Sequence, residues 1–118
     1  MFAQEIKEHL VKEIIPFWMN LKDDVYGGFY GYLGYDLVLD KQAVKGCILN
    51  SRILWFFSNA YLLLQEESLL ECAKHAFLFL KERCIDRENG GVYWSLTYDG
   101  KPEDTTKHTY NQAFAIYA

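Results

Sequence analysis

Two stretches of this chain repeat each other, and this repeat constrains the fold more than any other sequence feature. Residues 23–36 align without a gap to residues 86–99, 63 positions later, and seven of the fourteen aligned pairs are identical. Unrelated segments of this length would share about one residue. A period of about 60 residues is too long for one helix pair of the common short repeats, so it indicates a larger unit of two helices joined by a short extended hairpin.

Helical periodicity fills the segments outside the repeat. Apolar residues spaced by three or four predict an amphipathic helix over residues 3–21, and Pro16 predicts a kink or break near Ile15. A second stripe over residues 53–64 predicts a helix with Asn50 or Ser51 as its N-cap.

A third helix is expected to begin at Ser68, with Glu71 completing a capping box. Its expected core face contains Leu69, Cys72 or Ala73, Ala76, Phe77 and Leu80, and runs to Cys84. A fourth helical pattern starts near Tyr110 and reaches Ala118 without a cap or turn residue.

The predicted order is helix, hairpin, helix, helix, hairpin, helix. We interpret residues 1–118 as a single partial domain of the all-α class, containing about two helix-pair units of a longer repeat protein. Apolar residues on the last helix, Phe114, Ile116 and Tyr117, would then lack a covering unit, so we expect the isolated chain to be marginally stable, self-associating or completed by a partner chain.

Charge and composition limit the classes of binding partner and the cellular location expected for this chain. The formal net charge is −4 without a Lys/Arg cluster, which argues against nucleic acid. We expect no membrane helix, because we find no apolar run that approaches the roughly 18 residues required. We expect no export signal, because residues 1–5 lack a basic segment followed by an apolar one. Three scattered cysteines are typical of reduced thiols, and a cytoplasmic location is therefore expected.

Aromatic residues make up 17% of the chain and gather near the repeated segments and the helix starts that follow them. Two interpretations remain open. The rings could pack where helix ends meet hairpins, or they could form a surface on which sugar rings stack through their apolar C–H faces.

Arg52 is the most suggestive single residue. In the predicted first turn of its helix, a cation opposes the helix dipole, so a purely structural choice would favour Asp or Glu. Arg52 could be a solvated or hairpin-paired side chain, or it could bind an anion or oxyanion at the mouth of a pocket. Tyr110 stands at the equivalent helix start one unit later and is a candidate either for ligand contact at the same mouth or for packing.

Other chemistry is less well supported by the sequence. His9 and His75 are expected on the solvated surface, and Cys72 with His75 would be only half of a metal site, so no metal is assigned. Neither a phosphate-binding glycine loop nor a nucleophile signature is present. The loop carboxylates could support glycosidase chemistry, but their recurrence at equal places favours turn and cap duties; they are Asp23, Asp24, Asp36, Asp86 and Asp99.

Five stretches together give the chain a family resemblance. They are Ile15-Pro16-Phe17-Trp18, residues 27–32 (GGFYGY), residues 50–55 (NSRILW), residues 89–94 (NGGVYW) and residues 107–118 (KHTYNQAFAIYA). Taken in this order over the whole chain, they resemble the N-acylglucosamine 2-epimerase superfamily, and within it the cellobiose 2-epimerases.

The resemblance implies the N-terminal portion of an (α/α)6 barrel that acts on a reducing-end sugar without a metal or nucleotide cofactor. Such enzymes open the sugar ring, and one histidine removes the C2 proton to give an enediolate that a second histidine can reprotonate on the other face. The resemblance assigns Arg52 to the C1/C2 oxygens, as a charge-stabilising catalytic residue, and Tyr110 to substrate binding. The family's catalytic histidines match no residue of this chain, and His108 lies in the wrong motif to replace them.

The expected function is therefore inversion at C2 of the reducing-end glucose of cellobiose or a related β-1,4-disaccharide, with a small-molecule sugar as the partner. One alternative is an N-acylglucosamine 2-epimerase or aldose–ketose isomerase acting on a monosaccharide. The alternative from another class is a non-catalytic helical-repeat module that binds glycans or protein.

Overall fold

The computed structural model describes residues 1–118 and is mainly helical, in the predicted order of elements. The helices are α1 (Phe2–His9), α2 (Ile15–Met19), α3 (Cys47–Leu64), α4 (Glu67–Phe79) and α5 (Thr109–Tyr117), with π-helical turns at Leu10–Ile14 and Leu80–Cys84. The strands are β1 (Tyr32–Leu33), β2 (Leu39–Asp40), β3 (Lys45–Gly46), β4 (Ser95–Leu96) and β5 (Pro102–Asp104).

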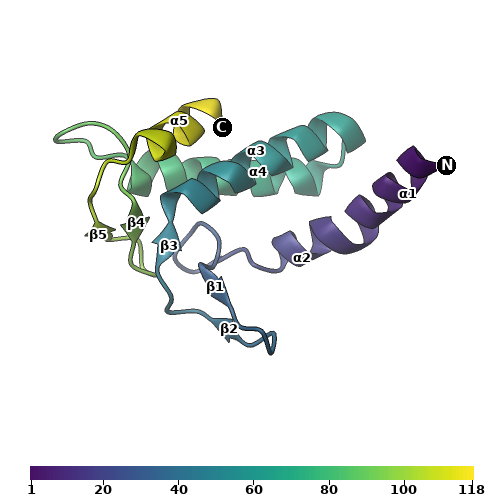
Figure 1. The fold of residues 1–118 in the computed structure, drawn as a ribbon, viewed down its shortest axis with the longest axis horizontal. Helices are drawn as coiled ribbons and strands as arrows, with labels where there is room; N and C mark the ends of the chain where they lie inside the picture. The colour runs from purple at the N-terminus through teal and green to yellow at the C-terminus, as the bar shows by residue number, and fades with distance from the viewer.

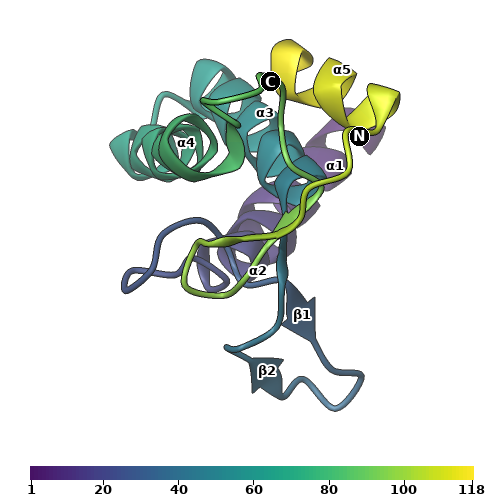
Figure 2. The ribbon, with the colours of Figure 1, turned by 90° about the vertical axis from the view of Figure 1, so that its left-hand side faces the viewer.

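Helix α3 is the centre of the molecule. It packs side by side with α4 and also contacts α5, while α1 and α2 form a separate arm on the other side (Figures 1 and 2). The core between α3, α4 and the loops contains Phe29, Phe57, Leu69 and Leu96, which are fully or almost fully buried. This packing confirms the predicted α3 stripe, in which Ile53, Leu54 and Phe57 are buried.

The break predicted near Ile15 is present as a π-helical turn between α1 and α2. The Ile15 N–H bonds to the carbonyl of Leu10, five residues earlier, instead of four. Pro16 has no N–H and its ring needs space beside the preceding turn, so a widened turn lets the helix continue past it. The first helix is therefore continuous but deformed.

The extended segments after the glycine pairs form two small antiparallel sheets. In the first unit β1 pairs with β2, with Tyr32 opposite Asp40. In the second unit β4 pairs with β5 and also with β3, which immediately precedes α3. The hairpin expectation is confirmed, and the β3–β4 pairing joins the two units in a way that the repeat did not indicate.

The expected helix caps are wrong. Helix α3 begins at Cys47, so Asn50 and Ser51 lie inside the helix and are buried, and α4 begins at Glu67 without a side-chain cap from Ser68. The Asn50 side chain instead reaches back to the first loop, where its Oδ1 accepts a hydrogen bond from the Phe29 N–H at 3.0 Å. On α4, Phe79 is buried whereas Phe77 is half exposed, which corrects the expected core face at that position.

Helix α3 also bears on the expectations for membrane helices and for the cysteines. With 18 residues and a single charged side chain, α3 is long and apolar enough to cross a membrane by length and composition, contrary to the expectation from sequence; 39% of it is buried within the chain. Its first residue, Cys47, lies beside Cys84, although the two cysteines are far apart in the sequence. A hydrogen bond between the Cys84 thiol and Cys47, and then burial, raise the pKa of the Cys84 thiol far above its ordinary value. All three cysteines are free and buried.

Candidate functional site

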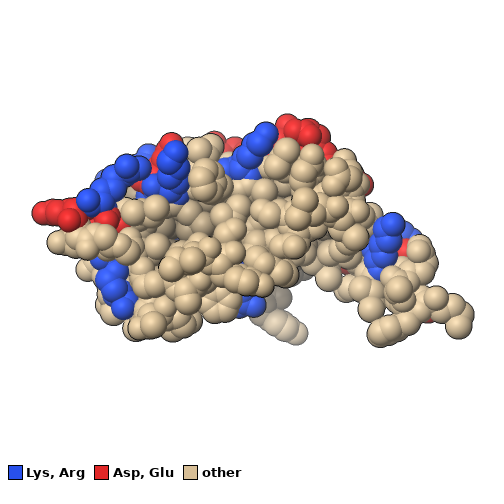
Figure 3. Space-filling view, turned by 90° about the horizontal axis from the view of Figure 1, so that it is seen from above, with Lys and Arg blue, Asp and Glu red and all other residues tan.

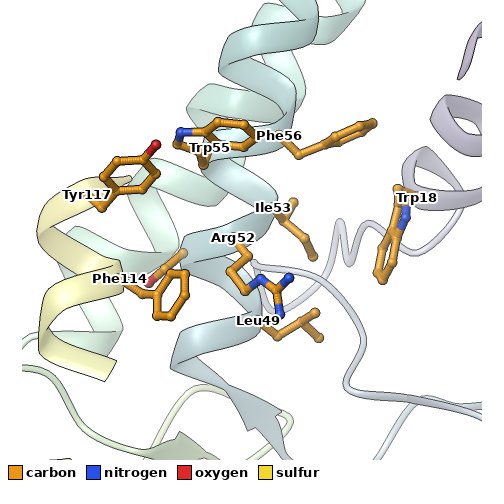
Figure 4. Close-up of a pocket in the computed structure, with 9 residues that line it drawn as sticks. Trp18, Leu49, Arg52, Ile53, Trp55, Phe56, Phe114 and Tyr117 are labelled. Carbon is orange, nitrogen blue, oxygen red and sulfur yellow. The ribbon is translucent and has the colours of Figure 1, made fainter. Parts of the chain in front are cut away.

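A hollow of about 540 Å³ opens beside the first half of α3. Residues of α2, α3 and α5 line it, and most of them are apolar or aromatic (Figure 4). The lining residues are Trp18, Leu49, Ser51, Arg52, Ile53, Trp55, Phe56, Phe114 and Tyr117. A largely aromatic concavity with one charged group is the usual composition of a site that binds a small polar molecule.

Arg52 is the only charged residue of the hollow. Its guanidinium lies over the ring of Phe114, with the carbon 5.7 Å from the ring centroid, and it takes part in none of the five ion pairs of the chain (Figure 4). Because α3 begins at Cys47, Arg52 lies in the second turn, which corrects the predicted position in the first turn and weakens the argument from the helix dipole. The features of Arg52 that suit anion binding are therefore its unpaired guanidinium and its aromatic surroundings.

Tyr110 does not line the hollow. It is half exposed at the start of α5, where its ring meets Trp94 at 5.7 Å and His108 at 6.2 Å between ring centroids. The Trp94 and His108 rings are themselves 4.5 Å apart. Tyr110 precedes Phe114 by four residues, so both lie on the same face of α5. The structure brings Arg52 together with Phe114, and places Tyr110 one turn away in a separate aromatic cluster.

Sequence reasoning missed five aromatic residues of the hollow as site candidates. Trp55 and Tyr117 stack with ring centroids 6.0 Å apart and planes at 17°, while Trp18 faces Arg52 from the other side of the hollow (Figure 4). Phe56 and Phe114 are the other two. The three-residue spacing from Arg52 to Trp55 and from Phe114 to Tyr117 was a usable signal, because each pair shares a helix face.

The repeated aspartates serve the loops, as their recurrence predicted. Asp23 Oδ1 accepts the backbone N–H groups of Val25 and Tyr26, and its Oδ2 lies 2.6 Å from the Nζ of Lys45, which also donates to the Gly27 carbonyl. Asp86 repeats this pattern with Glu88, Asn89, Lys107 and Gly90. These carboxylates are committed to structure and are not available for acid–base catalysis.

The pKa values of both aspartates reflect these contacts. Burial by itself raises the pKa of Asp23, but the hydrogen bonds from Lys45 and from two backbone N–H groups outweigh it, and the pKa lies below its ordinary value. The hydrogen bond from Lys107, and then that from the Asn89 backbone, hold the pKa of Asp86 well below its usual range. Both groups are therefore anionic near neutral pH.

The histidines divide into three environments. His9 is exposed, as expected. His75 is partly buried, with its Nε2 2.9 Å from the Gly28 carbonyl oxygen and its ring edge-on to Phe29, so the expectation of a solvated surface residue is wrong. His108 lies in the aromatic cluster with Trp94 and Tyr110. No group of three His, Cys, Asp or Glu side chains is placed to hold a metal ion in residues 1–118.

Comparison with solved structures identifies these helix-pair units as part of an (α/α)6 barrel. In a solved structure described as a sugar epimerase from a ruminal bacterium, the matching part superposes on 99% of this chain with a TM-score of 0.97 and 62% sequence identity, and it makes up 30% of that chain. The cellobiose 2-epimerase from Bacillus thermoamylovorans matches 98% of this chain with a TM-score of 0.97 and 46% identity, again over 30% of its own chain.

The sequence comparisons agree with the structural ones. Cellobiose 2-epimerase from Ruminococcus albus is 62% identical over 118 residues, which is the whole of this chain and 30% of the relative. Residues 27–118 match the profile of the N-acylglucosamine 2-epimerase family. The chain belongs to the N-acylglucosamine 2-epimerase family, and it spans about 30% of the length of the relatives it matches.

Proposed function

We propose that this chain is part of a carbohydrate epimerase that inverts C2 of the reducing-end glucose of cellobiose or a related β-1,4-disaccharide. The proposal is supported by membership of the N-acylglucosamine 2-epimerase family and by 62% identity to a cellobiose 2-epimerase along the whole chain. In the proposed reaction the sugar ring opens and C2 loses a proton to a base. The resulting enediolate is reprotonated at C2 from the opposite face.

The observation that carries the proposal is the unpaired guanidinium of Arg52 in an aromatic hollow. When the C2 proton leaves, negative charge develops on the oxygens at C1 and C2. A guanidinium presents N–H donors in a planar fork that matches two neighbouring oxygens. Because no carboxylate neutralises Arg52 within the chain, its charge is available to stabilise the enediolate more strongly than the neutral sugar, which is the condition for lowering the barrier.

Tyr110 has a proposed role in holding the sugar. Its ring belongs to the cluster with Trp94 and His108, and its side chain is half exposed. Aromatic faces suit the apolar C–H surface of a sugar ring, while the phenol can hydrogen-bond a hydroxyl group. The base and acid of the reaction are assigned to no residue of this chain.

A chimera tests the function directly. Residues 1–118 would replace the matching segment of the Ruminococcus albus cellobiose 2-epimerase, and cellobiose would be incubated with the chimera in D2O. We expect deuterium to enter C2 of the reducing-end unit and mannose to appear at that position, both followed by NMR. The parent enzyme is the positive control. A chimera that melts cooperatively like the parent, yet leaves C2 free of deuterium, would contradict the proposed function.

A further inference from the structure

Arg52 contacts an aromatic ring and forms no ion pair with a carboxylate. Its guanidinium lies over the Phe114 ring at 5.7 Å, while the five ion pairs of the chain all use lysines. A carboxylate partner would fix the guanidinium but would also neutralise it. The face of a ring attracts the cation through its quadrupole and leaves the in-plane N–H donors free.

The packing of α5 against α3 fixes the Phe114 ring in this position. One turn further along both helices, Trp55 and Tyr117 stack with centroids 6.0 Å apart. The two contacts, Arg52 with Phe114 and Trp55 with Tyr117, therefore repeat along the α3–α5 contact at the same three-residue step. Figure 4 shows Arg52 and Trp55 on α3 beside Phe114 and Tyr117 on α5, with the Arg52 guanidinium inside the hollow.

We propose that Phe114 is a positioning residue that holds the Arg52 guanidinium ready to bind an oxyanion in the hollow. The identification of the enediolate as the natural oxyanion rests on the proposed function. Oxyanion binding by Arg52, with Phe114 holding its guanidinium in place, does not depend on that function. Phe114 touches Arg52 and acts through it. It has no chemical role of its own.

The test uses the 118-residue chain labelled with [15N]arginine and sulfate as the oxyanion probe. The Nε–H resonance of Arg52 is assigned by its loss in Arg52→Lys, and Arg83 and Arg87 serve as internal references. Phe114→Leu removes the ring face but keeps an apolar side chain, Phe114→Tyr keeps the face, and Ile116→Ala changes an exposed residue of the same helix outside the hollow.

We expect sulfate to shift the Arg52 resonance in the unmodified chain. Phe114→Leu should weaken sulfate binding about fivefold, the size of one cation–π contact, and should move the free resonance by removing the ring current. Phe114→Tyr should restore both values, and Ile116→Ala should change neither. Equal sulfate affinity and an unmoved Arg52 resonance in Phe114→Leu would overturn the proposal.

Two further measurements, a nuclear Overhauser contact and deuterium exchange by the chimera, complete the test of the role of Phe114. If Phe114→Leu fails to fold, the unmodified chain still answers the question, because absence of a nuclear Overhauser contact between the Arg52 side chain and the Phe114 ring overturns the proposal. Deuterium exchange by the chimera distinguishes the role of Phe114 from the proposed epimerase function. If sulfate binding depends on Phe114 but the chimera is inactive, the role of Phe114 is supported and the proposed epimerase function is contradicted. If the chimera is active but sulfate binding does not depend on Phe114, the epimerase function is supported and the role of Phe114 is contradicted.

Discussion

The Nζ of Lys45 lies 2.6 Å from the Asp23 carboxylate, and both side chains are almost completely shielded from solvent. The same pair recurs in the second unit, where Lys107 stands 62 residues after Lys45 and Asp86 stands 63 residues after Asp23. There the Lys107 Nζ lies 2.8 Å from the Asp86 carboxylate, and the lysine is partly exposed. Lys45 lies two residues before α3 and Lys107 lies two residues before α5, and each lysine joins the start of its helix to the preceding glycine loop. The chain therefore contains one buried and one partly exposed version of the same contact, which makes an internal comparison possible.

Lys45→Met should destabilise the chain strongly, because it leaves the Asp23 carboxylate buried without its cation. Loss of one partner of a buried pair costs about 3–5 kcal/mol. Lys107→Met is the matched control, and it should cost less because water reaches that site. Urea unfolding followed by circular dichroism measures both. Equal losses for the two variants would show that burial does not distinguish the two contacts.

The lowered pKa of Asp86 predicts a loss of stability in acid. Its pKa is lower in the folded chain than the unfolded value of about 3.9, so its contribution is fully present above that value and disappears as the pH falls toward the folded pKa. Asp86→Asn should make the unfolding free energy depend less steeply on pH below about pH 4. Glu103→Gln, at an exposed position without an ion pair, is the control. Parallel curves for Asp86→Asn and the unmodified chain would contradict the prediction.

Arg52→Ala in the chimera should lower the rate of C2 exchange about 10²–10³-fold, the usual effect of losing one oxyanion donor. The exchange rate of Arg52→Lys should lie between those of Arg52→Ala and the unmodified chimera, because lysine keeps the charge but loses the planar fork. Arg83→Ala removes an arginine outside the hollow and should leave the rate unchanged. If Arg52→Ala exchanged C2 within about threefold of the unmodified chimera, the catalytic role of Arg52 would be wrong.

Exposed apolar side chains predict self-association of the isolated chain. Leu62 and Leu63 at the end of α3 are 70% and 65% exposed, and Ile116 on α5 is 86% exposed. Viewed from above, the molecule shows a broad area without charged side chains (Figure 3). Large exposed apolar areas favour association.

Sedimentation velocity over a range of concentrations measures this association. The weight-average mass should rise with concentration, and Leu62→Glu combined with Leu63→Glu should lower it toward that of a monomer. A monomer at every concentration would contradict the prediction.

The sequence determined the parts of this protein that depend on short-range order. The 63-residue repeat predicted two equivalent glycine loops, apolar spacing predicted the helices, and the position of Pro16 predicted the deformed first helix. Each of these follows from the conformational preferences and periodicity of residues close together in the chain. The family resemblance was likewise carried by short motifs and was confirmed over residues 27–118.

Only the tertiary structure decided which partners the polar side chains take. Asn50 resembles a helix cap in sequence, but its amide bonds to Phe29, 21 residues earlier, and His75 bonds to Gly28, 47 residues earlier. Arg52 meets Phe114 from a helix 62 residues further along. The partner of a polar side chain depends on which groups the packing brings within reach and shields from water. None of these three long-range contacts is encoded in the local sequence pattern. The loops and helices of this chain can therefore be predicted from its sequence, whereas the surroundings of Arg52 are determined by the packing of α5 on α3.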